Sequence, residues 1–293
     1  MATEKTDVVI VGVGAAGAVL AAELTKAGLK VTALERGPRH TTADFAPQDE
    51  LRFFQRQDLR PDPKRQPVTW RPSPKARATP LRSLSYGNQV GGGTVHYGAV
   101  SWRFHEDDFR ARSHTIERYG EAAIPADSSL ADWPLSYADL EPFYDKAEYE
   151  IGVSGKAGNL LGQRIAGGNP FEAPRRRDYP LPPLQTDQSG ALFDEAARKL
   201  GYRPFSAPHA IISQAYRGRP GCTYCGFCQG SAAMSGRSRA RSSACCRRRM
   251  RPATSSSSPA RWPTASTPTT AAGQPACRIT ARAAATTRSR PTS

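Results

Sequence analysis

The sequence predicts an α/β fold in which an N-terminal nucleotide-binding unit is followed by part of a second domain and by a disordered tail. Three observations support this prediction. A β-branched run precedes a G-x-G-x-x-G turn close to the N-terminus. A second glycine-rich segment occupies residues 86–104, and residues 231–293 lack almost all large apolar side chains.

The first expected element is a strand at residues 8–11, because a Val-Val-Ile-Val run is typical of a strand buried on both faces. The glycine motif follows at Gly12, Gly14 and Gly17. These glycines allow a tight turn, close backbone approach to a pyrophosphate, and close packing of the following helix on the strand.

A helix is expected over residues 15–27, ending at Gly28. Its N-terminus favours negative charge, as a phosphate site requires. A second strand at residues 31–34 leads to Glu35, eighteen residues after Gly17, whose carboxylate is suited to accept hydrogen bonds from ribose hydroxyls. A glycine turn with a purely structural role is the alternative, and spacing alone does not separate FAD from NAD.

The charge is concentrated in the tail. The chain has 293 residues and a formal net charge of +15, but residues 231–293 contain 12 arginines and no acid. The remaining residues hold 29 basic and 26 acidic side chains, so their near balance argues against nucleic-acid binding. No apolar run is long enough for a transmembrane segment, and the first residues resemble no signal peptide, so a cytoplasmic location is expected.

The second glycine-rich segment, YGNQVGGGTVHYGAVSWRF, places three consecutive glycines before Thr94. A surface loop is one interpretation, and close backbone approach to a flat or charged group is the other. Together with the first motif, this segment resembles the glucose–methanol–choline (GMC) family of FAD-dependent oxidoreductases, in the branch of gluconate, sorbitol and glucose dehydrogenase flavoprotein subunits. Residues 102–104, 132–137, 140–144 and 218–222 resemble the same branch in the same order.

The resemblance implies a Rossmann-like FAD-binding segment at residues 1–110 and part of a substrate or cap domain at residues 111–230. It assigns the FAD-binding role to Gly12, Gly14, Gly17, Glu35, Arg36, Asn88, Gly91, Gly92, Gly93, Thr94 and His96. The implied reaction is oxidation of a CH–OH group of a sugar, sugar acid or alcohol by hydride transfer to the flavin. Family members hold their catalytic histidine in a C-terminal half that has no counterpart here, so no catalytic residue is assigned and no turnover is expected.

Two further helices are expected in the second domain. Ser136 is a suitable N-cap for residues 137–151, and apolar spacing predicts a structural helix over residues 189–200. The three arginines at residues 175–177 are expected to form a solvated turn, an acidic partner being the alternative.

All six cysteines lie beyond residue 220, which is not the pattern of a secreted disulfide framework. Cys222, Cys225 and Cys228 have the C-x2-C-x2-C spacing of three iron–sulfur ligands; zinc and structural or redox-active thiols are the alternatives. The resemblance implies that such a cluster passes electrons to a heme-containing subunit. A periplasmic or membrane-associated location would then require a partner that carries this chain there.

Residues 231–293 are expected to be disordered, because they cannot bury enough apolar surface to offset their conformational entropy. All but four of these 63 residues belong to amino acids that can have C or G as the second codon base. The segment therefore resembles an out-of-frame translation that begins near Gly230. This hypothesis predicts a family-like sequence in another frame of the same DNA.

Overall fold

A computed structural model of the chain describes residues 5–40, 51, 68–81, 87–95 and 97–224, and the backbone of 277–281. The chain divides into two compact units. One contains the described residues up to Gly98 together with the strand at 277–281, and the other is Ala99–Tyr224. The sequence placed this boundary at residue 110.

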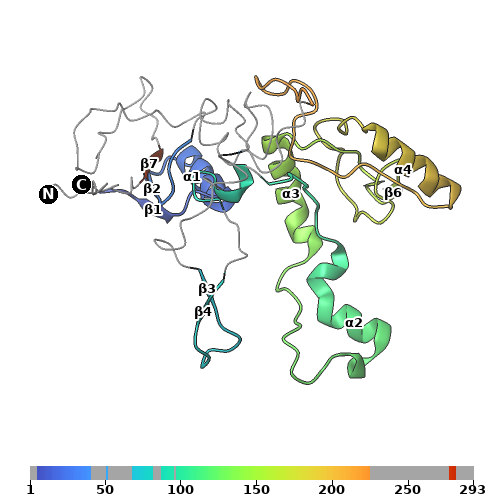
Figure 1. Cartoon of the computed structure of the whole chain (residues 1–293), viewed down its shortest axis with the longest axis horizontal. Coiled ribbons are helices and arrows are strands. Elements are labelled where there is room, and N and C mark those ends of the chain that lie inside the picture. Colours follow the sequence, from blue (N-terminus) through green and yellow to red (C-terminus); the bar gives the residue numbers. More distant parts are fainter. Residues whose placement is uncertain are drawn as a thin grey trace, which may run out of the picture. The chain divides into compact units, whose positions relative to one another are not determined.

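The first unit contains the expected β–α–β order. Strand β1 (Val8–Val11) leads through helix α1 (Ala15–Lys26) to strand β2 (Val31–Glu35), as Figure 1 shows. The two strands are parallel, with Val8 opposite Val31. The α/β prediction for the N-terminus is therefore confirmed.

Helix α1 covers one face of this sheet with small side chains. Ala18 and Ala21 are fully buried against Ile10, which lets helix and strand approach closely. On the other face, Val9 is 54% and Val11 is 84% exposed. The expectation that β1 is buried on both faces is therefore wrong for the described residues, because among them only α1 packs on the sheet.

Part of the expected disordered tail forms a strand. Strand β7 (Cys277–Ala281) pairs in parallel with β2, with Val31 opposite Cys277 and Glu35 opposite Ala281, which gives the sheet order β1–β2–β7. For these five residues the expectation of disorder is wrong. It considered only side-chain burial, whereas an open strand edge also offers main-chain hydrogen bonds to almost any sequence.

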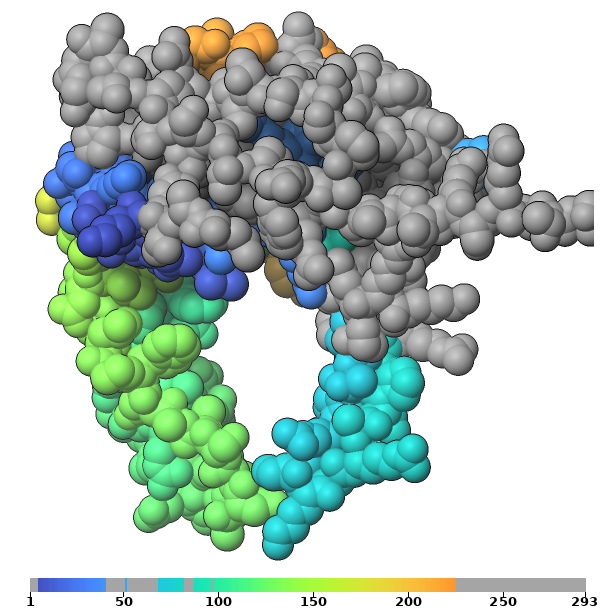
Figure 2. All heavy atoms as spheres, turned by 90° about the vertical axis from the view of Figure 1, so that its left-hand side faces the viewer, coloured from blue at the N-terminus to red at the C-terminus, as the bar shows by residue number. Residues whose placement is uncertain are grey.

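Two short elements complete this unit. Strands β3 (Thr69–Trp70) and β4 (Thr79–Pro80) form an antiparallel hairpin. Its residues are exposed, Trp70 among them, and Figure 2 shows the hairpin in cyan at the molecular surface. A 3₁₀ turn, η3 (Gly92–Val95), begins within the second glycine-rich segment.

The regular elements of the second unit are mainly helices. Its elements are η4 (Glu106–Arg110), α2 (Ala111–Tyr119), η5 (Glu121–Ala123), α3 (Tyr137–Ile151), β5 (Asn159–Leu160), β6 (Gln163–Arg164) and α4 (Gln188–Lys199). Ser136 caps α3 as expected, in a reciprocal capping box with Asp139. Within the described residues, no helix combines the length and the apolarity needed to cross a membrane.

The buried residues of α3 include two carboxylates, Glu141 and Glu148, as well as the aromatic Tyr137. Glu148 accepts two hydrogen bonds from Arg103, at 2.8 Å each, and a third from Arg175. Arg103 also bonds Glu141 at 3.1 Å, and Arg175 bonds Glu172 at 2.9 Å. We call this set of five side chains the arginine–glutamate cluster.

Arg175 corrects one expectation. It is 1% exposed, so it is no part of a solvated turn, and Arg177 in the same run binds Asp145 at 2.7 Å. Burial, the largest single influence, lowers the pKa of Arg175, but the combined attraction of Glu148, Tyr179 and Glu172 exceeds it, so the pKa of Arg175 lies above its usual value. The partners on α3 lie 27 and 32 residues away in the sequence, so the arginine run by itself did not reveal them.

The N-cap of α4 predicts a loss of stability in acid. Asp187 accepts from the amide of Gly190 at 2.7 Å, and this bond holds the pKa of Asp187 below its usual value. Because the pKa is lower in the folded state, the stabilisation is complete above the unfolded pKa of about 3.9 and is lost as the pH falls through the folded value.

Asp187→Asn should keep the cap without titrating, since asparagine also caps helices well. We expect its urea midpoint to fall less than that of the unchanged chain between pH 6 and pH 3. Asp187→Ala should lower the midpoint at pH 6 already. Identical pH profiles for the unchanged chain and Asp187→Asn would show that this carboxylate contributes nothing to the acid dependence.

Candidate functional site

The first glycine motif forms a tight turn between β1 and α1. Gly12 has φ +91°, in the region that favours glycine, and its amide donates to the carbonyl of Leu34 at 2.7 Å. A Cβ at Gly17 would lie 2.0 Å from the carbonyl oxygen of Gly12, whereas one at Gly14 would meet nothing within 4 Å. The absence of a side chain at Gly17 thus permits close packing against Gly12, whereas the position of a side chain at Gly14 is open space.

Helix α1 begins without a side-chain cap. Its N-cap is Gly14, and its first turn contains no acidic residue. The first-turn amides of an uncapped helix are available to a ligand or to water, and the helix dipole favours an anion there.

The structure brings the second glycine segment against the first. The amide of Gly91 donates to the carbonyl of Val13 at 2.7 Å, and a Cβ at Gly92 would lie 3.6 Å from the Cα of Gly14. Both glycines have positive φ, +96° and +55°. Thr94 donates its hydroxyl to the carbonyl of Gly91 at 2.5 Å and so closes the turn that contains Gly93.

Glu35 ties the end of β2 to the glycine turn. One carboxylate oxygen accepts from the amide of Val13 at 2.8 Å, and the other accepts from the amide of Gly37 at 2.9 Å. Each oxygen retains a second lone pair, so the carboxylate can still accept from a hydroxyl group. Glu35 is thus fixed in position beside the turn.

Two adjacent amide residues close to this turn have buried side-chain atoms without a hydrogen-bond partner among the described residues. Gln89 is 1% exposed, and within the described structure neither its Oε1 nor its Nε2 has a partner. The buried Oδ1 of Asn88 is also unpaired. The backbone of both residues lies against Gly37, where a Cβ would come within 2.3 Å of the Gln89 amide nitrogen.

Sequence reasoning named Asn88 but missed Gln89. A signal existed in the sequence, since Gln89 is a polar residue two positions before the three consecutive glycines of the second glycine-rich segment. A buried amide without partners costs about 1–3 kcal/mol, so native structures rarely leave one unpaired. An absent ligand is one of the few explanations for such a group.

The structure gives less support to the remaining candidate residues. Arg36 lies on the surface after β2, and His96 is outside the described residues. Cys222 is partly buried, and its amide donates to the carbonyl of Ile212 at 2.7 Å. Cys225 and Cys228 lie outside the described residues, and within the described part no group of metal-binding side chains occurs.

The histidines of the second unit have structural contacts. His105 caps η4 by accepting from the amide of Asp107 at 3.3 Å, and His114 lies 3.2 Å from the carboxylate of Asp107. The Nδ1 atom of His209 is 2.8 Å from the carbonyl oxygen of Ala207. These contacts favour structural roles for these three histidines.

The residues of the glycine site fit an extended dinucleotide such as FAD. The uncapped helix and the open space at Gly14 suit a pyrophosphate, and the fixed carboxylate of Glu35 suits a ribose. The unpaired amides offer further donor and acceptor atoms. Each of these features lies in the first unit, within residues 12–94.

Comparison with known proteins supports the same cofactor. Residues 7–100 match the family described as FAD binding domain. The gluconate 2-dehydrogenase flavoprotein of Pantoea cypripedii is 41% identical over 244 residues, which cover 78% of this chain and 40% of that protein. The fructose dehydrogenase large subunit of Gluconobacter japonicus is 30% identical over 239 residues, which cover 75% of this chain and 39% of that protein.

A third relative, the 2-methyl-1,2-propanediol dehydrogenase of Mycolicibacterium austroafricanum, is 29% identical over 224 residues, with 74% of this chain and 35% of that protein covered. The chain thus spans about two fifths of the length of these relatives or less. The resemblance drawn from the two glycine segments is confirmed over that length: the chain contains an FAD binding domain and is similar to the matched part of flavoprotein dehydrogenases of the GMC type.

Proposed function

We propose that this chain is the FAD-binding portion of a dehydrogenase that oxidises a CH–OH group of a sugar, sugar acid or other alcohol. One observation supports FAD binding above the others. Two glycine segments more than 70 residues apart meet at an uncapped helix, beside a buried amide that has no partner among the described residues. The names of the three relatives, which concern gluconate, fructose and a diol, motivate the substrate class.

The roles of the chain's own residues follow from the geometry. The amides at the start of α1 bind the pyrophosphate, and Glu35 accepts from the ribose. Gly91 and Gly92 keep the second segment close enough to line the cofactor without side chains in the way. Bound FAD supplies the hydride-accepting chemistry, and the protein supplies binding and orientation.

Replacing Gln89 with leucine is expected to move stability and cofactor affinity in opposite directions. Leucine removes an unpaired buried amide, so the free energy of unfolding of the FAD-free chain should stay equal or rise by about 1 kcal/mol. The affinity for FAD should fall at least about fivefold, because the amide's hydrogen bonds to the cofactor are lost. Urea unfolding and the quenching of flavin fluorescence measure the two effects.

Val90→Leu, next to Gln89 in the same segment, serves as the control and should leave FAD affinity within about twofold. Unchanged affinity in Gln89→Leu would remove Gln89 from the cofactor site. Failure of the unchanged chain to bind FAD, or binding of NAD in its place, would overturn the proposed function itself.

We also propose that Cys222 is one thiolate ligand of an iron–sulfur cluster with Cys225 and Cys228, through which electrons pass to a heme-containing subunit. The described part of the site offers one supporting feature. The amide of Tyr224 donates to the sulfur of Cys222 at 3.4 Å, and such N–H···S bonds are typical of cluster ligands. Iron and acid-labile sulfide analysis of anaerobically prepared protein tests this proposal, and Cys222→Ser should abolish any signal.

A further inference from the structure

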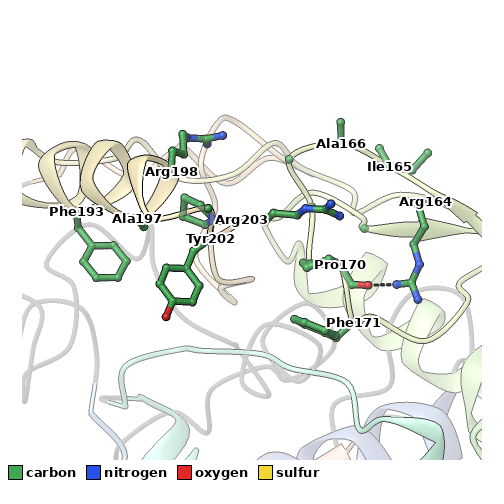
Figure 3. A pocket seen from close by; sticks show the side chains of 15 residues that line it. Arg164, Ile165, Ala166, Pro170, Phe171, Phe193, Ala197, Arg198, Tyr202 and Arg203 are labelled. Atoms are coloured by element: carbon green, nitrogen blue, oxygen red, sulfur yellow. Dashed lines mark hydrogen bonds between the residues drawn. The ribbon is translucent and has the colours of Figure 1, made fainter.

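A broad groove in the second unit is lined by three arginines and three aromatic rings. It lies between α4, the loop that follows α4 and the β6 region, and has a volume of about 1170 Å³. Figure 3 shows Phe193, Tyr202 and Phe171 with their rings on the same side of the groove, and Arg203 extending toward Pro170. We call this the arginine–aromatic groove, defined by Arg164, Phe171, Phe193, Arg198, Tyr202 and Arg203.

The aromatic rings are largely exposed. Phe171 is 75%, Phe193 69% and Tyr202 69% exposed, although such side chains gain most from burial. Apolar spacing predicted a structural helix here, yet Leu192 and Leu200 of that pattern are 58% and 75% exposed, and the buried residue of α4 is Ala197. Among the described residues, nothing covers this face of the helix, and clustered exposed aromatics are typical of interaction sites.

The arginines of the groove are not neutralised. In the described part of the chain, Arg164, Arg198 and Arg203 form no ion pair, and no carboxylate is among the residues that line the groove. Arg164 instead donates to the carbonyl of Pro170. Elsewhere in the same unit, Arg103 and Arg175 each have at least two acidic partners, so the groove differs from its surroundings.

The positive charge extends to one neighbouring lysine. A Cβ at Gly167, which lines the groove, would lie 3.0 Å from the Nζ atom of Lys156. Four cationic groups therefore surround an apolar floor, and a complementary occupant must present carboxylates around apolar side chains.

We propose that the arginine–aromatic groove is the docking surface for an acidic segment of a second polypeptide, which inserts apolar side chains between the rings. Its volume exceeds that of ordinary small-molecule pockets, about 300–1000 Å³, which favours a polypeptide segment over a metabolite. Arginine and tyrosine are enriched among the residues that dominate binding energy at protein interfaces. The near balance of charge over residues 1–230 argues against a general polyanion site. The proposal is independent of FAD binding.

The test uses the full 293-residue chain and a fluorescein-labelled peptide, (Glu-Phe-Asp-Leu)₃, followed by fluorescence anisotropy. We expect saturable binding that weakens at least about fivefold between 50 and 300 mM salt, because screening reduces the attraction. Arg198→Glu and Arg203→Glu should each raise Kd at least about tenfold. Phe193→Ser should raise Kd by about fivefold without changing the salt dependence.

Matched control variants lie outside the groove. Arg118→Glu on α2 makes the same charge change, and Phe143→Ser on α3 removes an equally exposed ring, 67% accessible. Both should leave Kd within about twofold. All of these side chains are exposed, so the variants should fold, and equal far-UV circular dichroism checks this.

Four results would overturn the proposal. The first is equal binding of a peptide with lysine in place of each acid. The second is an unchanged Kd in Arg198→Glu. The third is complete displacement of the peptide by millimolar AMP, which would identify a small-molecule site instead. The fourth is dimerisation of the unchanged chain that is lost in Arg198→Glu, because the groove would then bind a second copy of this chain and not an acidic partner.

Discussion

Alanine at Gly14 and alanine at Gly17 are expected to have opposite consequences, although both glycines belong to one turn. Gly17→Ala should lower the free energy of unfolding by about 2–3 kcal/mol, since its methyl group would lie 2.0 Å from the carbonyl oxygen of Gly12. The backbone of the turn must move to relieve this contact. FAD binding should then be lost together with the native turn.

Gly14→Ala should change stability by less than about 1 kcal/mol, because φ is −79° and a Cβ there meets nothing within 4 Å. Its affinity for FAD should nevertheless fall at least about tenfold, or about 1.4 kcal/mol, because the methyl group occupies the space that a pyrophosphate needs at the start of α1. These two results together would show that bound FAD, and not the fold, requires the open space at Gly14.

Urea unfolding and FAD titration of both variants distinguish these effects, with Gly98→Ala as the control. Gly98 also has no neighbour within 4 Å but lies outside the turn, so both quantities should match those of the unchanged chain. Normal FAD affinity in Gly14→Ala would show that the pyrophosphate does not approach this end of the helix.

Removing the charge of Glu148 should destabilise the second unit more than any surface substitution. Glu148 is 5% exposed and is the acidic partner shared by Arg103 and Arg175, whose side chains are 3% and 0% exposed. Glu148→Gln leaves both guanidinium groups buried with one carboxylate fewer. Breaking a buried ion pair in this way costs about 3–5 kcal/mol.

Glu195→Gln is the matched control. Glu195 binds Lys199 at 2.7 Å on the exposed surface of α4, and such pairs contribute at most about 0.5 kcal/mol. Both variants make the same Glu→Gln change. The difference between their losses in free energy of unfolding, measured with urea, therefore gives the effect of burial. A loss below about 1 kcal/mol in Glu148→Gln would mean that water reaches the cluster and solvates the arginines.

A buried cluster of this kind is weak evidence for added stability, since apolar residues of similar volume often serve as well. Its clearer effect is to fix the relative positions of the segments that it joins. Arg103, α3 and the segment around Arg175 are fixed to one another by hydrogen bonds in defined directions. The cluster thereby positions the β5–β6 region at one side of the arginine–aromatic groove.

The sequence by itself determined the local features of this protein. The β–α–β order, the glycine turn and the cap at Ser136 each depend on residues within a few positions of one another. Strand propensity, glycine conformation and capping chemistry act over that range, so a short pattern is sufficient to predict them. The family resemblance followed from the same short patterns.

Only the tertiary structure decided which distant groups meet. It gave Arg175 its partner on α3 and left the aromatic rings of α4 and its loop exposed. It also buried the amide of Gln89, which has no partner in the part of the chain that the structure describes. It also gave β2 a neighbour from a segment that had no apolar pattern. Such contacts depend on how elements pack over tens of residues, and a pattern within one element does not specify which other element covers it.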